Sequence, residues 1–384
     1  MSVLYDASIF ASQKFGGISR YFVELIKGID SAQFKDNDCS FSVRLPPSVH
    51  INHYLKDIAS QQSKFSKCVH VPPFRNTGVI RHAVNDALLG RFLKKTKIDI
   101  YHDTFYQMCR YKIPHGVKKC VTVYDFIHEL FSDSWRNSKG DGFADSIKQK
   151  HQCIREADLL FCISDSTKSD LMNILGLSED RIVVTHLASS LMSNFDLPIN
   201  KVKQDVPQGR PYVLFVGQRG WYKNFMTLLN AFGLNAQLKL NFDLMVFGGG
   251  SFTTDESNEI SRLGLTENIR LRTGGDHELI QAYAGASVFC FPSKYEGFGI
   301  PLLEAFDFDV PSVVADIPVF REVAGSAAVF FDKDSPEDCA NALLRILGSV
   351  SLQSELKNSM RNQRQKYSWG KTTELTSHGY LRLI

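Results

Sequence analysis

The sequence predicts an α/β protein built from two doubly wound domains, each with a parallel sheet covered by helices on both faces. Short apolar runs alternate with longer amphipathic stretches along the whole chain, a pattern typical of parallel sheets. A polar, turn-rich stretch at residues 189–211 interrupts the alternation and reads as a linker. The length of 384 residues exceeds one ordinary core and suits two.

Eleven short apolar runs are expected to be strands, because each is bounded by turn residues or by a helical pattern. Before the break they lie at residues 3–5, 98–101, 121–124, 159–163 and 182–185. After the break they lie at residues 212–216, 244–247, 269–271, 288–291, 312–315 and 328–331.

Composition narrows the class of protein. Hydrophobic residues make up 43% and charged residues 22%, as in soluble globular proteins. No apolar run reaches about 18 residues, and the N-terminus lacks the basic and apolar segments of a secretory signal. The eight cysteines are scattered without a C-x-x-C pair, which argues against a zinc site or a disulfide framework. We therefore expect a cytoplasmic protein.

The charge is distributed unevenly. The net charge of +3 argues against a dedicated nucleic-acid binder. Residues 1–98 nevertheless hold fourteen Lys and Arg against seven Asp and Glu, a net charge of +7. This basic segment could meet an anionic lipid surface or a phosphorylated acceptor. A solvated basic face is the alternative.

The loop after residues 288–291 carries the most informative motif. Gly297 and Gly299 leave its backbone bare, and Pro301 suits the first turn of a helix. Free amides at a helix N-terminus attract phosphate. Glu296 in the loop and Glu304 one turn into the helix could accept hydrogen bonds from hydroxyl groups of a ligand. The pattern favours a nucleotide sugar; a helix start with favourable acidic residues is the plainer alternative.

The string EGFGIPLLE resembles the E-x₇-E motif of the family 4 glycosyltransferases. The resemblance implies that Glu296 contacts hydroxyls of the transferred sugar and is catalytic, and that Glu304 binds the ribose. It also implies that the backbone at Phe298, Gly299 and Ile300 approaches the donor diphosphate.

The resemblance further implies the GT-B fold, in which two Rossmann-like domains face a central cleft. Residues 1–195 would form the acceptor domain and residues 210–368 the donor domain, with a final helix at about 369–384 packing back on the first. Transfer in this family retains the anomeric configuration and needs no metal. The donor would be a GDP- or UDP-sugar.

A second loop, after residues 212–216, contains Arg219 and Lys223 among glycines. A departing nucleoside diphosphate gains negative charge, which fixed cations can stabilise without a metal. The resemblance implies this role for both residues. Surface charge on a loop is the alternative, and Arg219 lies closer to Lys223 than in many relatives.

Three further glycines are implied in donor binding. Gly16 and Gly17 precede an amphipathic helix, and relatives place a similar pair opposite the donor diphosphate. Gly274 lies where relatives hold the nucleobase.

Residues after two N-terminal strands are candidates for the acceptor. Asp125 ends residues 121–124, where relatives often have His-Asp; this chain has Tyr124 before the acid. Asp125 would orient the acceptor or the sugar. His128 and His102 are acceptor-binding candidates, each with a structural alternative.

These observations predict a retaining hexosyltransferase of polysaccharide assembly. Mannose is the first choice of sugar, and a glycan or lipid-linked glycan is the expected acceptor, with the basic N-terminal domain resting on the inner membrane face. A nucleotide-sugar epimerase or phosphorylase of the same fold, or a non-catalytic relative, remains an alternative. A nicotinamide dehydrogenase is disfavoured, since no G-x-G-x-x-G follows the first strand.

Overall fold

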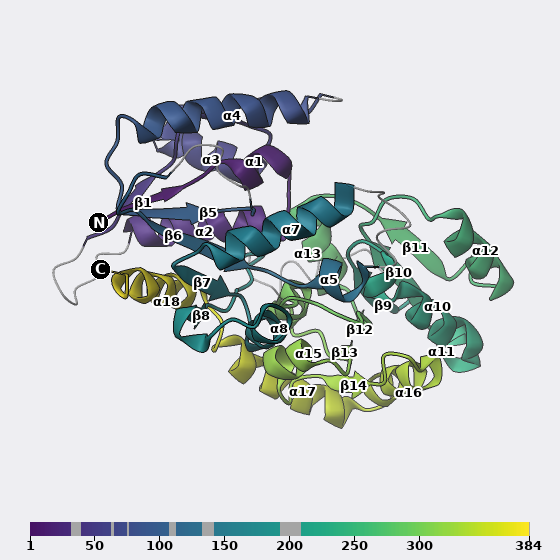
Figure 1. Ribbon diagram of the computed structural model, residues 1–384. Coiled ribbons are helices and arrows are strands. Elements are labelled where there is room, and N and C mark those ends of the chain that lie inside the picture. The colour runs from purple at the N-terminus through teal and green to yellow at the C-terminus, as the bar shows by residue number, and fades with distance from the viewer. Residues whose placement is uncertain are drawn as a thin grey trace. The chain divides into compact units, whose positions relative to one another are not determined.

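The computed structural model describes residues 1–31, 40–62, 65–74, 77–106, 113–132, 142–192 and 209–383. The chain forms two compact units, Met1–Leu187 with Trp369–Ile384, and Ala188–Ser368 (Figure 1). Much of the predicted linker, residues 193–208, lies outside the described residues. In the described part of the chain, no helix is long and apolar enough to cross a bilayer.

The first unit contains a six-stranded parallel sheet in the order β2-β1-β5-β6-β7-β8. Its strands are β1 (Ser2–Tyr5), β2 (Ser42–Arg44), β5 (Ile100–Asp103), β6 (Lys118–Val123), β7 (Leu159–Cys162) and β8 (Ile182–Val184). A separate parallel pair joins β3 (Ser48–His50) to β4 (Cys68–His70). The winding direction of the main sheet reverses between β1 and β5, which makes this the switch point of the unit.

Helices flank this sheet, and the last of them comes from the C-terminal end of the chain. They are α1 (Ser8–Ser12), α2 (Gly17–Ser31), α3 (His53–Gln61), α4 (Gly78–Leu93), α5 (Ile127–Leu130), α7 (Gly142–Arg155), α8 (Asp165–Leu175) and α18 (Trp369–Leu381). Helix α18 packs on α2 and β8. A Cβ at Gly28 of α2 would lie 2.2 Å from Thr373 Oγ1 of α18, so the glycine permits this close approach.

The second unit has a six-stranded parallel sheet in the order β11-β10-β9-β12-β13-β14. Its strands are β9 (Tyr212–Val216), β10 (Asp243–Phe247), β11 (Ile269–Arg272), β12 (Val288–Phe291), β13 (Ser312–Ala315) and β14 (Val329–Phe331). This is the common dinucleotide-fold order, with its switch point between β9 and β12.

The helices of the second unit follow its strands. They are α10 (Phe225–Leu234), α11 (Ala236–Asn241), α12 (Thr254–Arg262), α13 (Asp276–Ala284), α14 (Ile300–Asp307), α15 (Pro318–Ala324), α16 (Pro336–Leu347) and α17 (Val350–Arg364). A short 3₁₀ turn, η3 (Trp221–Lys223), lies between β9 and α10.

The prediction of two doubly wound parallel sheets is confirmed, and all eleven predicted strands are present. The inner strands are buried on both faces, as in β12, where every residue is fully buried, whereas the edge strand β11 exposes Arg270 and Arg272. Three strands were missed, namely β2, β3 and β4. Each has only three residues and mixes polar with apolar side chains, so no apolar run marks it.

Candidate active site

The switch point of the second unit brings together the two loops that carry the strongest motifs. Strands β9 and β12 are adjacent and parallel, so residues 217–224 and 292–299 leave the sheet at the same edge. The Lys294 amide donates to the Tyr222 carbonyl at 2.8 Å, and the Asn224 side chain donates to the Pro292 carbonyl at 3.0 Å. Asn224, which sequence analysis did not single out, has a φ of 55° and is buried. These contacts fix one loop against the other.

Lys223 and Glu296 form an ion pair across these two loops. Lys223 Nζ lies 2.7 Å from Glu296 Oε1, and the Ser293 hydroxyl donates to the same oxygen at 2.6 Å. The Lys223 and Glu296 side chains are 14% and 10% exposed, so each retains a solvent-facing part. Partnering avoids the large penalty of an isolated buried charge. A carboxylate and an ammonium are thus held side by side at the switch point, and their contacts with a donor stay predictions.

The backbone between Glu296 and α14 is shaped by Gly299. Its φ of 106° is disfavoured for any residue with a side chain, and a Cβ there would lie 3.0 Å from Phe320 Cε1. Helix α14 begins at Ile300, with Pro301 in its first turn as predicted. The Phe298 side chain is buried. First-turn amides carry the positive end of the helix dipole, and the diphosphate contact of Phe298, Gly299 and Ile300 stays a prediction.

Glu304 lies one turn into α14 and is 6% exposed. The Tyr283 hydroxyl of α13 donates to Glu304 Oε2 at 3.0 Å and to the Pro301 carbonyl at 3.1 Å. Burial, with the nearby Glu304 carboxylate, raises the pKa of Tyr283 well above its usual value, which keeps this donor protonated. Tyr283, a residue that the sequence pattern did not mark, thereby orients Glu304; the ribose contact stays a prediction.

Arg219 contacts the chain itself. Its side chain is only 4% exposed, and its Nε donates to Glu256 Oε1 at 2.9 Å. The guanidinium also donates to the carbonyls of Gly248 at 2.9 Å, Gly250 at 3.0 Å and Ser251 at 2.7 Å. Glu256 balances the charge of the guanidinium, and backbone carbonyls accept hydrogen bonds from its N–H groups. Arg219 therefore holds the loop after β10, and the diphosphate contacts of Arg219 and Lys223 stay predictions.

Replacing Arg219 with Lys is expected to destabilise the second unit by about 2 kcal/mol or more. A single ammonium cannot replace the several N–H donors of the planar guanidinium, and the buried Glu256 carboxylate would lose part of its pairing. Thermal unfolding and hydrogen exchange of residues 248–256 would measure the loss. Arg262→Lys, in an exposed ion pair with Glu259 on α12, is the matched control with a small expected effect. A stable Arg219→Lys variant with weakened nucleotide binding would contradict this assignment.

Gly274 lies after β11, two strands away from β9 in the sheet. A Cβ there would lie 2.6 Å from Glu278 Cβ, so the residue is glycine because Glu278 folds back over it. The Glu278 carboxylate accepts from the Gly275 amide at 2.8 Å and caps α13. A structural reason for Gly274 is present, while its contact with a nucleobase stays a prediction.

Gly16 and Gly17 open helix α2 of the first unit. A Cβ at Gly16 would lie 2.3 Å from Gln13 Oε1, and this oxygen accepts from the Ser19 amide at 3.3 Å. Gly17 is the exposed first residue of the helix. A side chain at Gly16 would therefore displace the end of the flexible Gln13 side chain, and the donor contact of both glycines stays a prediction.

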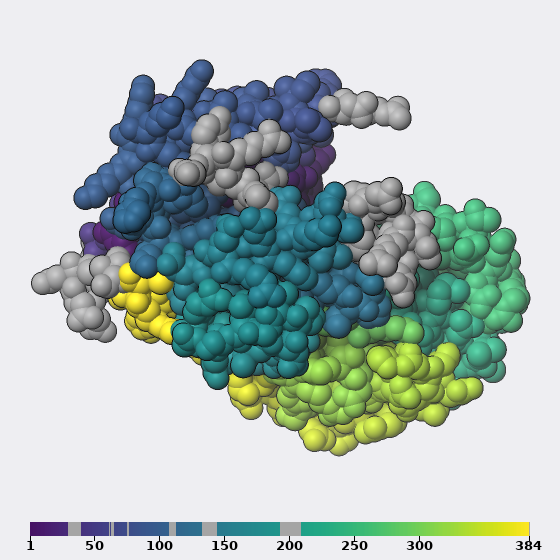
Figure 2. Space-filling view, viewed as in Figure 1, coloured from purple at the N-terminus to yellow at the C-terminus, as the bar shows by residue number. Residues whose placement is uncertain are grey.

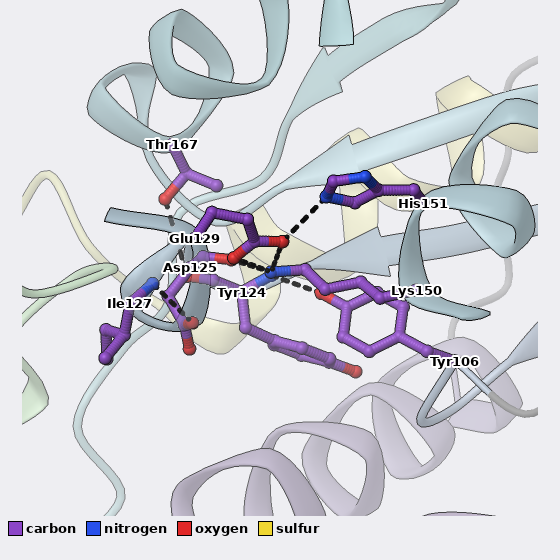
Figure 3. Close-up of polar contacts among 8 residues, drawn as sticks. All are labelled: Tyr106, Tyr124, Asp125, Ile127, Glu129, Lys150, His151 and Thr167. Atoms are coloured by element: carbon purple, nitrogen blue, oxygen red, sulfur yellow. Dashed lines mark hydrogen bonds and ion pairs between the residues drawn. The ribbon is translucent and has the colours of Figure 1, made fainter. Parts of the chain in front are cut away.

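Asp125 follows β6 and is only half-buried. Its Oδ1 accepts from the Ile127 amide at 3.2 Å, which closes the turn into α5 (Figure 3). Its backbone carbonyl accepts from the Lys150 ammonium of α7. His128, on α5, is also half-buried. The catalytic role of Asp125 and the acceptor contact of His128 stay predictions.

A buried ion pair contacts the turn that begins at Asp125. Lys150 Nζ lies 3.0 Å from Glu129 Oε1, and His151 Nε2 lies 3.0 Å from the same oxygen (Figure 3). Lys150 is 5% exposed, and its ammonium lies 4.4 Å from the Phe126 ring centroid. A buried, fully partnered lysine is a strong constraint on backbone position. Sequence analysis missed this cluster because its members come from separate helices.

The acceptor contact predicted for His102 requires a correction. It is completely buried, with Nδ1 at 2.6 Å from the Tyr380 hydroxyl and Nε2 at 2.9 Å from Thr122 Oγ1. Its ring stacks on Phe161 at a centroid distance of 5.3 Å. Burial lowers the pKa of His102 to about 3. With no exposed atom and both nitrogens partnered, His102 is a core residue and not an acceptor contact.

Two family models cover most of the chain. The model described as Glycosyltransferase Family 4 matches residues 15–188, and the model described as Glycosyl transferases group 1 matches residues 197–366. O-antigen chain mannosyltransferase B of Escherichia coli is 28% identical over 290 residues, covering 73% of this chain and 74% of that protein. The serotype-specific mannosyltransferase WbdA of the same species is 26% identical over 241 residues, 59% of this chain and 29% of that protein.

Solved structures match over nearly the whole chain. Sucrose-phosphate synthase from Thermosynechococcus elongatus has a TM-score of 0.75 at 15% identity, covering 100% of this chain and 99% of that one. Anabaena Alr3699/HepE in complex with UDP-glucose has a TM-score of 0.71 at 15% identity and covers 100% of both chains. WaaG, a glycosyltransferase involved in lipopolysaccharide biosynthesis, has a TM-score of 0.66 at 14% identity, with 98% of both chains covered.

Proposed function

The chain belongs to family 4 of the glycosyltransferases, and from this premise we propose that it moves mannose from a nucleotide-diphosphate sugar to a surface glycan with retention of anomeric configuration. The GT-B fold and the broader class, a hexosyltransferase of polysaccharide assembly, follow from the family and the relatives. The donor, the sugar, the stereochemistry and the acceptor are the proposed part.

The observation that carries the proposal is the Lys223–Glu296 pair at the switch point of the second unit. Glu296 would hold hydroxyls of the transferred sugar. Lys223 would stabilise the charge that develops on the departing diphosphate, together with amides at the start of α14. With a protein cation in that position, the proposed reaction needs no metal.

The relatives support the choice of donor. O-antigen chain mannosyltransferase B and WbdA are named for mannosyl transfer, which favours a mannosyl donor, with GDP as the first choice of nucleotide. Anabaena Alr3699/HepE was solved with UDP and with UDP-glucose, which supports a nucleotide-sugar donor.

The proposed acceptor is a glycan or a lipid-linked glycan. A relative named as an O-antigen chain mannosyltransferase favours a surface glycan as the acceptor, and the lipid link is part of the proposal. The proposed location is therefore the cytoplasm, with peripheral contact at the inner membrane face through the basic N-terminal domain.

A screen of nucleotide sugars by thermal shift tests the donor assignment. GDP-mannose is expected to raise the unfolding temperature of the wild-type chain, since a ligand at about 100 times its Kd adds about 2.7 kcal/mol of stability. UDP-glucose, UDP-galactose and free mannose serve as comparisons. A shift with UDP-sugars alone would contradict the mannosyl donor, and no shift with any nucleotide sugar would contradict the donor site.

The release of nucleotide then separates the proposed transferase from an epimerase. A transferase is expected to release GDP from GDP-mannose much faster when a mannan oligosaccharide or lipid-linked glycan is added. If GDP is released equally fast with and without acceptor, and the sugar changes its stereochemistry, an epimerase would be supported instead.

A further inference from the structure

The outer face of helix α4 is apolar although it is exposed. The inner face buries Asn85, Leu89, Gly90 and Leu93. The outer face carries five exposed apolar residues, and no exposed charged residue lies among them on this face. These are Val79, Ile80, Ala83, Val84 and Ala87, with Val79, Ile80 and Val84 exposed to 82%, 66% and 40%.

This arrangement differs from an ordinary surface helix, whose outward face is polar. Helix α4 packs on α1 and β3 and forms the outermost layer of its unit in Figure 1, and Figure 2 shows the blue atoms of this region at the surface. Phe74, just before the helix, adds a side chain that is 69% exposed. Single exposed apolar residues are common, but a contiguous apolar helix face marks an interaction surface.

Basic residues continue this surface at the C-terminal end of the helix. Arg91, Lys94, Lys95 and Lys97 are all exposed. Between residues 74 and 97 the sequence holds six Lys and Arg against a single acid, Asp86, which is half-buried. The complement of such a surface is a partner that is both apolar and anionic.

We propose that this face of α4 docks on an anionic phospholipid bilayer, an inference that rests on the proposed transfer to a lipid-linked acceptor. With 16 residues, the helix is about 24 Å long and would lie in the plane of the interface. Val79, Ile80 and Val84 would enter the boundary between headgroups and acyl chains, and the basic residues would meet lipid phosphates. A symmetric dimer formed through this face would bring two basic segments, rather than anionic groups, to the same interface.

Vesicle flotation with the full chain tests the proposal. Vesicles of equal parts phosphatidylglycerol and phosphatidylethanolamine should carry the wild-type protein, and vesicles of phosphatidylcholine alone should not. The double variant Val79→Asp, Ile80→Asp is expected to bind the anionic vesicles about tenfold more weakly or worse. The matched control is Val350→Asp, at a position of α17 that is 79% exposed in the second unit, and it should bind like wild type.

Three results would overturn the proposal. The double variant could bind anionic vesicles as well as wild type does. Wild type could bind neutral and anionic vesicles equally. Alternatively, wild type could self-associate in ultracentrifugation without lipid and lose this association in the double variant, which would assign the face to a second copy.

The nucleotide-sugar thermal shift, measured on the same wild-type and variant proteins, keeps this test separate from the proposed function. A chain that binds a nucleotide sugar but no vesicle would contradict the docking surface alone. A chain that binds vesicles but no nucleotide sugar would contradict the proposed donor site alone. The double variant is expected to keep the wild-type nucleotide shift, because its substitutions lie in the first unit and Lys223 and Glu296 in the second.

Discussion

Replacing Glu296 with Ala is expected to lower kcat for glycosyl transfer by about 10³-fold or more while the chain stays folded. The substitution removes the carboxylate that would hold hydroxyls of the transferred sugar. It also releases Lys223, whose ammonium lies 2.7 Å from Glu296 Oε1, from its fixed position. A group placed to stabilise the transition state contributes only while its position is held, so both losses act on the same step.

Glu296→Gln provides a second variant in case the Ala variant loses stability. The amide oxygen can still accept from the Ser293 hydroxyl, now at 2.6 Å from Glu296 Oε1, and the side-chain volume is kept. The fold should therefore survive, and kcat should still fall by about 10²-fold because the neutral amide neither pairs with Lys223 as strongly nor binds hydroxyls as well.

Acceptor-dependent release of nucleotide and thermal unfolding should be measured together for each variant. Glu337→Ala changes an exposed glutamate in the first turn of α16 of the same unit and should leave turnover unchanged. If both variants stay folded and keep near-normal turnover, Glu296 is not an active-site residue. The proposed joint role of Lys223 and Glu296 would then be contradicted.

The sequence predicted the sheets well because parallel strands buried on both faces are apolar throughout. Residues 288–291 form one such run, and the structure buries all four of them as β12. The motif after this run could also be placed, since Gly299 and Pro301 have local requirements at a helix start. Strand burial and the residue requirements at a helix start could therefore be predicted from residues close together in the chain.

The surroundings of Arg219 and His102 depend on contacts with distant residues, which the sequence did not show. Arg219 in a glycine-containing loop has the features of an exposed anion contact, yet Glu256, 37 residues away, neutralises it. His102 at the end of a strand resembles a site residue, yet Tyr380, 278 residues away on α18, closes over it. No local pattern encodes which distant side chain completes a polar network, so these residues could be interpreted only after the fold was known.

Acidification from about pH 7.5 to about pH 5.5 is expected to lower the free energy of unfolding of the first unit by about 3 kcal/mol. Burial lowers the pKa of His102 to about 3 and, with the neighbouring His70, that of His50 to about 4. Both imidazoles are completely buried and stay neutral in the folded chain over this range. In the unfolded chain each has a pKa of about 6.5 and takes up a proton.

The sign follows from proton uptake. Below about pH 6.5 the unfolded state binds more protons than the folded state, so stability falls as the pH falls. Each histidine contributes about 1.4 kcal/mol per pH unit within its window, which runs from about 6.5 down to its folded value. Carboxylates titrate mostly below this range. Urea unfolding of the full chain, with hydrogen exchange of peptides from β5 and α18 corrected for intrinsic rates, would report the first unit.

The slope of stability against pH, and not its absolute value, tests the role of His102. His102→Phe keeps a ring against Phe161 but removes the titrating group and its bonds to Tyr380 and Thr122, so this variant should be less stable at every pH. Its slope should nevertheless be clearly smaller than that of wild type, because the pKa values of His50, His53 and His82 are still lowered but that of His102 is gone. His378→Gln, at an exposed position of α18, should keep the wild-type slope. An unchanged slope in His102→Phe would mean that another group controls the acid sensitivity of this unit.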